Sequence, residues 1–117
     1  MRIFRFITTI ISSTLMTSCV INPNKISIAY PNWAEGIAVT HLAREILVEQ
    51  GFQVELLNAD IAPIFTSLAR GKTDVFLDSW LPVTHKPYFE KYQGKFEILG
   101  QVFDSARIGL VVPAYVP

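Results

Sequence analysis

The chain has 117 residues, enough for one small domain, and its ten Lys and Arg residues balance its ten Asp and Glu residues. This balance leaves no basic patch, so nucleic acid is not expected as a partner. Cys19 is the only cysteine, which excludes a disulfide bond within the chain.

The amino terminus has the pattern of a secretory signal. Arg2 and Arg5 precede an uncharged, mostly apolar run over 6–16, and small residues follow at 17 and 18. A run of eleven residues is too short to span a bilayer as a helix, which takes about twenty. We therefore predict a signal peptide over 1–18 and an exported protein that acts in the periplasm or at the outer cell surface.

A lone cysteine directly after the apolar core is typical of a lipoprotein signal. Cys19 would then be acylated and would anchor the protein to the membrane, with 19–24 as a tether. Met16 stands where such signals usually have leucine, and Leu15 comes one residue earlier. Ordinary cleavage near Ser18, which would leave a free thiol, is the alternative. Either cut removes two arginines, so eight basic and ten acidic residues remain, a formal charge of −2.

The rest of the chain alternates between strand and helix patterns. Strand, helix, strand, helix, strand predicts a βαβαβ unit, an α/β fold with a parallel sheet, right-handed crossovers and flanking helices. Strands are expected at 25–30, 54–57 and 74–77, with helices at 36–50 and from Asp60 to Gly71. A short helix or turn is expected near 86–92. Further strands are expected at 97–99 and 108–112.

Two tryptophans follow predicted strands, and a histidine follows the second of them. Trp33 comes just after the first strand, while Trp80 and His85 come just after the third. Ligand sites of α/β proteins usually lie at the carboxyl ends of parallel strands. Indole faces attract cations, and they can desolvate a quaternary ammonium group that has no N–H to donate. An imidazole N–H can bind a carboxylate, more strongly if the ring is protonated, so the three residues suit a small zwitterion.

Several segments resemble the substrate-binding proteins of ABC-type glycine betaine and proline betaine (osmoprotectant) transporters. They are 28–30, 33–38 (WAEGIA), 58–60 (NAD), 78–86 (DSWLPVTHK) and 106–113 (ARIGLVVP), in this order. The resemblance implies a type II periplasmic-binding-protein fold, in which two α/β lobes close over the ligand. It also implies that Trp33 and Trp80 belong to an aromatic cage around the ammonium group, and that His85 helps to hold the carboxylate. An ABC permease would receive the ligand.

Only the first lobe of that fold is expected in this chain, over 25–113, with 114–117 as the start of the hinge and the second lobe absent. The alternatives are a truncated remnant that does not bind, or one half of a split binding protein. Choline, carnitine, proline betaine and ectoine remain open as ligands. No cofactor and no metal site are expected, and an enzyme is disfavoured because no nucleophile–base pair is evident. His41, Glu35 and Asp78 are not assigned to the site.

Overall fold

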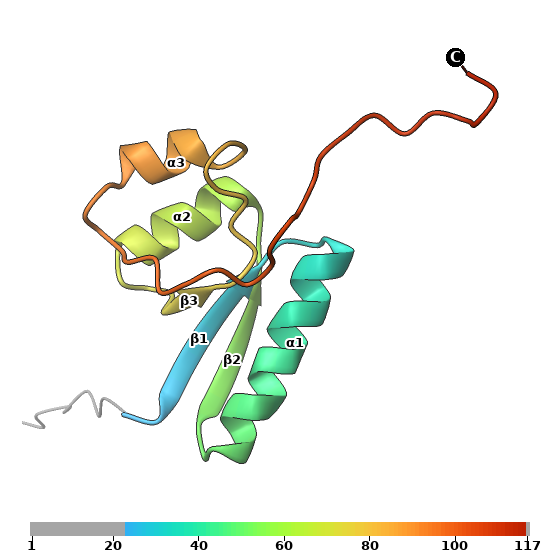
Figure 1. Ribbon diagram of the computed structural model, residues 1–117. Helices are drawn as coiled ribbons and strands as arrows, with labels where there is room; N and C mark the ends of the chain where they lie inside the picture. Colours follow the sequence, from blue (N-terminus) through green and yellow to red (C-terminus); the bar gives the residue numbers. More distant parts are fainter. Residues whose placement is uncertain (1–22, 117) are drawn as a thin grey trace, which may run out of the picture.

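The computed structural model describes residues 23–116 as an α/β arrangement of three strands and three helices (Figure 1). The predicted signal peptide over 1–18 and the predicted lipidation site Cys19 lie outside the described residues. The elements, in chain order, are β1 (Lys25–Tyr30), α1 (Ala34–Glu49), β2 (Gln53–Asn58), α2 (Ile61–Ala69), β3 (Val75–Phe76) and α3 (Lys86–Lys91).

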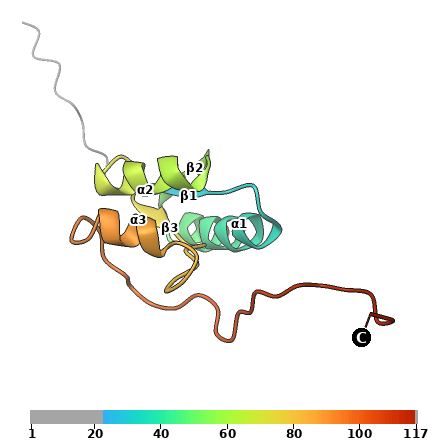
Figure 2. The ribbon, with the colours of Figure 1, turned by 90° about the horizontal axis from the view of Figure 1, so that it is seen from above.

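The three strands form a parallel sheet in the order β2-β1-β3, which confirms the predicted α/β class. Ile28 of β1 pairs with Leu56 of β2 on one side and with Val75 of β3 on the other. The chain steps from β1 to β2 in one direction and from β2 to β3 in the opposite direction. Two right-handed crossovers therefore place α1 and α2 on opposite faces of the sheet. In Figures 1 and 2, α1 lies along β1 and β2, and α2 lies on the side of β3 and α3.

The first two helices end close to the predicted positions, while α1 begins at Ala34, two residues before the predicted start at Gly36. Asp60 occupies the N-cap position of α2, although its side chain makes no capping hydrogen bond. Gly51 and Gly71 follow α1 and α2 with positive φ angles of 89° and 62°. Glycine adopts this left-handed conformation without a steric penalty, so each helix ends at a residue suited to the turn.

The core is small and centres on β1 and α2. Ile28 and Ala29 of β1 are buried together with Ile64 and Phe65 of α2. Burial does not alternate along β1, since Ser27 is buried next to Ile28 and Ala29. A central strand of a parallel sheet is covered on both faces, so both sets of its side chains lose contact with water.

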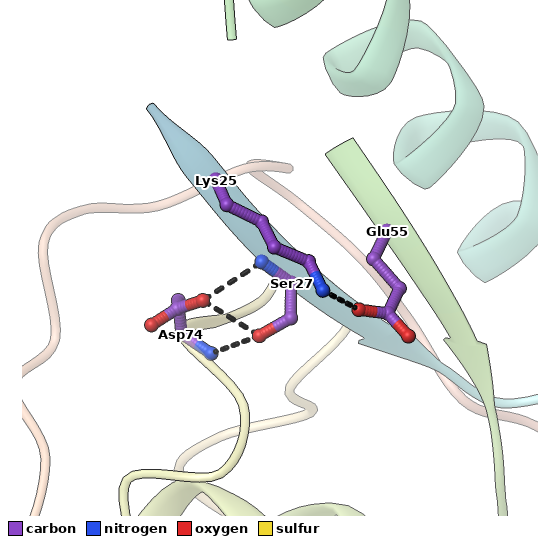
Figure 3. Close-up of polar contacts among 4 residues, drawn as sticks. All are labelled: Lys25, Ser27, Glu55 and Asp74. Atoms are coloured by element: carbon purple, nitrogen blue, oxygen red, sulfur yellow. Dashed lines mark hydrogen bonds and ion pairs between the residues drawn. The ribbon is translucent and has the colours of Figure 1, made fainter. Parts of the chain in front are cut away.

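A polar contact fixes the start of β3 against β1 (Figure 3). Asp74 Oδ2 accepts hydrogen bonds from the backbone N–H of Ser27 at 2.7 Å and from Ser27 Oγ at 2.6 Å. The backbone N–H of Asp74 donates to Ser27 Oγ at 3.1 Å. Between β1 and β2, Lys25 Nζ and Glu55 Oε2 form an exposed ion pair at 2.7 Å. Asp74 and Ser27 thus set the register at the amino end of β3.

The two strands predicted at 97–99 and 108–112 are wrong. The structure assigns neither segment to a strand, and Figure 1 shows the chain beyond α3 continuing as an extended trace. Leu110 and Val111 are each 98% exposed. Extended backbone becomes a strand only when its N–H and C=O groups pair with a neighbouring strand. Within 23–116 no strand pairs with either segment, so neither becomes part of the sheet despite its apolar residues.

Candidate functional site at the carboxyl ends of β1 and β3

The three residues predicted for the site lie at one edge of the sheet. Trp33 follows β1 and is the N-cap residue of α1, and Trp80 follows β3. Because β1 and β3 are neighbouring parallel strands, their carboxyl ends meet at the same edge. His85 is the N-cap residue of α3, five residues beyond Trp80.

A closed loop holds Trp80 and His85 in fixed relation. The backbone N–H of Trp80 donates to Nδ1 of His85 at 2.9 Å, and the backbone N–H of His85 donates to the carbonyl oxygen of Trp80 at 2.9 Å. The Leu81–Pro82 peptide within the loop is cis. The two hydrogen bonds join Trp80 and His85, the two ends of this loop, directly to each other.

The imidazole of His85 lies among aromatic rings. Trp33 stacks on it with a centroid distance of 5.9 Å and an interplanar angle of 22°. Phe65 and Tyr88 approach it edge-on, at 5.7 Å and 6.4 Å. His85 is only 2% exposed, whereas Trp33 is 37% exposed. Trp33 thus presents ring surface to solvent, while His85 joins both tryptophans: Trp33 by stacking and Trp80 by a hydrogen bond.

The hydrogen bond to Nδ1 decides the state of the His85 ring. Since Nδ1 accepts a hydrogen bond from the Trp80 amide, the neutral ring carries its own proton on Nε2. Burial lowers the pKa of His85, which also favours the neutral ring. The neutral ring therefore keeps one N–H donor, on Nε2, while the protonated form, which would bind a carboxylate more strongly, is disfavoured.

Asp78 is a further residue of this cluster that the sequence did not assign. The residue is 4% exposed, and its Oδ1 accepts a hydrogen bond from the indole Nε1–H of Trp80 at 2.9 Å. Burial raises the pKa of Asp78, and the charge of nearby Glu35 raises it further, while the bond from Trp80 opposes both effects. Asp78 lies only two residues before Trp80 in the sequence, which could have indicated that it belongs to the site. The alternation of side chains along a strand did not decide whether its carboxyl group points toward the site or away from it.

Most of the remaining aromatic and charged residues have local roles. His41 is exposed and lies edge-on to Tyr30. Glu35 lies in the first turn of α1, where a negative charge is favourable. Tyr88 stacks on Phe65, and Phe89 packs on Phe96, as expected for packing residues. Between residues 23 and 116, no three His, Cys, Asp or Glu side chains gather closely enough to hold a metal ion.

Comparison with known proteins identifies the family. Residues 24–117 match the family described as the substrate binding domain of ABC-type glycine betaine transport systems. The chain belongs to this family. The match covers most of the chain and includes every residue of the candidate site, so the resemblance inferred from separate motifs is confirmed.

Two relatives place the chain within the family. It is 35% identical over 95 residues to the glycine betaine/carnitine transport binding protein GbuC of Listeria monocytogenes, which covers 81% of this chain and 32% of GbuC. The crystal structure of lactococcal OpuAC, closed and complexed with glycine betaine, matches 66% of this chain and 30% of its own, with a TM-score of 0.63 and 31% identity. The chain thus spans about a third of the length of either relative.

The likeness to OpuAC confirms the expected periplasmic-binding-protein fold for the part that is matched. In the described part of this family member, no helix is both long and apolar enough to cross a membrane. Neither of two surface hollows, one beside α2 and one at the amino ends of β1 and β2, is lined by Trp33, Trp80 or His85. Of the three residues of the candidate site, Trp33 is partly exposed, Trp80 is half-buried and His85 is buried.

Proposed function

We propose that Trp33, Trp80 and His85 form one lobe's share of a site for glycine betaine or a related quaternary ammonium osmoprotectant. The two indoles would line a cage for the ammonium group, and Nε2–H of His85 would donate to the carboxylate. The observation that carries this proposal is the linked arrangement of the three residues at one edge of the sheet. The complex of OpuAC with glycine betaine supports this choice of ligand.

The proposed setting is an ABC importer. The chain would act outside the cytoplasm after export by the signal over 1–18, anchored through lipid on Cys19, and would deliver its ligand to a membrane permease. It would bind and release ligand without changing it chemically. The match to a family of transport binding proteins supports this setting.

A second proposal concerns the lobe that would close the site. Residues 25–113 would form one lobe of a two-lobed binding protein, and a second lobe would close over the ligand. The supporting observation is the exposed apolar run at Ile108, Leu110, Val111 and Val112, since such surface is costly in water without a partner. Half a site would bind weakly, because one missing cage wall costs about 2 kcal/mol, roughly thirtyfold in affinity.

Titration of the purified chain with glycine betaine, followed by indole fluorescence, tests both proposals. Unmethylated glycine serves as the control ligand, because it keeps the carboxylate but has no quaternary ammonium group. A second titration adds a chain that carries the part of GbuC beyond the matched region. We expect a weak response alone and tighter binding with the added chain. A folded protein that responds in neither titration would contradict the proposed function.

A further inference from the structure

Asp78 lies between the indole of Trp80 and the first turn of α1. On one side its Oδ1 accepts the hydrogen bond from Trp80 Nε1–H at 2.9 Å. On the other side its Oδ2 lies where Gly36 has no side chain, 2.6 Å from the position that a Cβ atom there would take. A carbon atom cannot sit that close to an oxygen, so Gly36 leaves the space that Asp78 occupies.

The two contacts join the two halves of the candidate site. Gly36 is buried in the first turn of α1, three residues after Trp33, and Asp78 comes two residues before Trp80. Oδ2 makes no hydrogen bond to a described residue although it is fully buried, so Oδ1 and the packing against Gly36 hold the carboxyl group. An indole has a single donor, Nε1–H, and the acceptor of that donor constrains the plane of the ring.

We propose that Asp78 is the positioning residue for Trp80, and that it holds the indole plane in register with the start of α1 through Gly36. The purpose of this positioning, which is to present the ring face to an ammonium group, rests on the proposed function. The hydrogen bond and the steric contact are properties of the free protein. They can therefore be tested without ligand.

The indole N–H resonances report on this contact directly. The chain has two tryptophans, so a ¹⁵N-labelled sample gives two indole cross-peaks, which Trp33→Phe and Trp80→Phe assign. In Asp78→Ala the Trp80 peak should move toward the position of a free indole, because its acceptor is gone. In Asp78→Asn the peak should stay close to its original position, since the amide oxygen still accepts. Asp60→Asn, which changes an exposed carboxylate without a capping bond, should leave the peak in place.

The pH dependence of the Trp80 peak provides a second readout. The peak should titrate with Asp78 at a pH above the usual range of aspartate, because burial raises the pKa of that group. Glu35 of α1 and His85 at the start of α3 also face this cluster. Glu35→Gln and His85→Asn therefore show how much of the pH-dependent shift of the Trp80 peak comes from Glu35 and from His85. Asp78→Asn should abolish the part of that shift that comes from Asp78.

Gly36→Ala tests the steric half of the proposal. The added methyl group should displace Asp78 and move the Trp80 peak in the same direction as Asp78→Ala. Gly100→Ala is the matched control, because a Cβ atom there meets nothing within 4 Å.

An unchanged Trp80 peak in folded Asp78→Ala, or a full titration that persists in Asp78→Asn, would overturn the proposal. If Asp78→Ala does not fold, the Asp78→Asn titration and the Gly36→Ala shift decide the outcome. Failure of betaine binding with these shifts intact would count against the proposed function alone.

Discussion

Trp80 and His85 bind each other through two hydrogen bonds of opposite direction, one to Nδ1 of the imidazole and one to the carbonyl oxygen of Trp80. The pair closes the loop after β3 and leaves Nε2–H of His85 as the donor. Trp33 completes the arrangement by stacking on the imidazole. One histidine thus links two tryptophans that are 47 residues apart in the sequence.

Replacing Trp33 should reduce ligand binding more than stability. Trp33→Ala removes one cage face, which costs about 2 kcal/mol of binding free energy, roughly thirtyfold in affinity. The ring is 37% exposed, and its stacking on His85 should contribute only about 0.5–1.5 kcal/mol to folding. Glycine betaine titrations and urea unfolding of the same samples measure both effects. Tyr115→Ala, which removes an aromatic ring that is 84% exposed, should alter neither.

Replacing His85 should discriminate between ligands. His85→Ala removes the Nε2–H donor proposed for the carboxylate, so the affinity for glycine betaine should fall. Choline has the same trimethylammonium group but no carboxylate, so its affinity should change less. Parallel titrations with both ligands measure the ratio. Equal losses for the two would contradict the role proposed for His85.

Stability should depend on the protonation of His85. Its pKa is lowered by burial, so the unfolded chain takes up this proton at a higher pH than the folded one does. The free energy of unfolding should therefore fall as the pH drops below about 6.5, the usual pKa of histidine, and should stop falling once the folded form is protonated. Urea unfolding at a series of pH values measures this slope. His85→Asn should reduce this slope.

The contact between Asp74 and Ser27 should stabilise the sheet above acidic pH. Hydrogen bonds from the Ser27 hydroxyl and backbone lower the pKa of Asp74, so its contribution is complete above the unfolded value near 3.8 and is lost as the pH falls through the folded value. Asp74→Asn should flatten this part of the stability profile. Ser27→Ala should flatten it in part, because the backbone bond remains. An unchanged profile in both variants would show that this contact does not hold β3.

Phe65 should be the most sensitive position of the core. Its ring is 2% exposed and contacts Phe76, His85 and Tyr88. Phe65→Ala should destabilise the fold by about 3–5 kcal/mol, as is usual for a buried phenylalanine. Thermal unfolding followed by circular dichroism measures this loss. Phe103→Ala, at a ring that is 52% exposed, is the matched control and should have little effect.

The elements with strong local signals could be predicted from the sequence. The period of α1 and α2, the glycines that follow them and the β-type runs at β1 and β2 each agree with the fold that forms. The edge of the sheet where Trp33, Trp80 and His85 gather follows from the parallel βαβ order. Each of these features depends on residues near one another in the sequence or on a general topological rule.

Features that depend on a distant neighbour could not be predicted. The run over 108–112 has the composition of a strand, but a strand also requires a partner, which the sequence of the run does not specify. The third strand is shorter than predicted, Val75–Phe76 instead of 74–77, since only these two residues pair with β1, at Ile28 and Ala29. The burial of Asp78 against Gly36 likewise depends on how α1 packs beside the end of β3.

The most direct test of the proposed site is a titration of the ¹⁵N-labelled chain with glycine betaine, observed at the indole N–H groups of Trp33 and Trp80 and at the His85 imidazole. All three should shift together with one dissociation constant, while an equal concentration of unmethylated glycine leaves both indoles in place. If saturating glycine betaine moves none of these signals, alone or with the added part of GbuC, the three residues do not form a quaternary ammonium site.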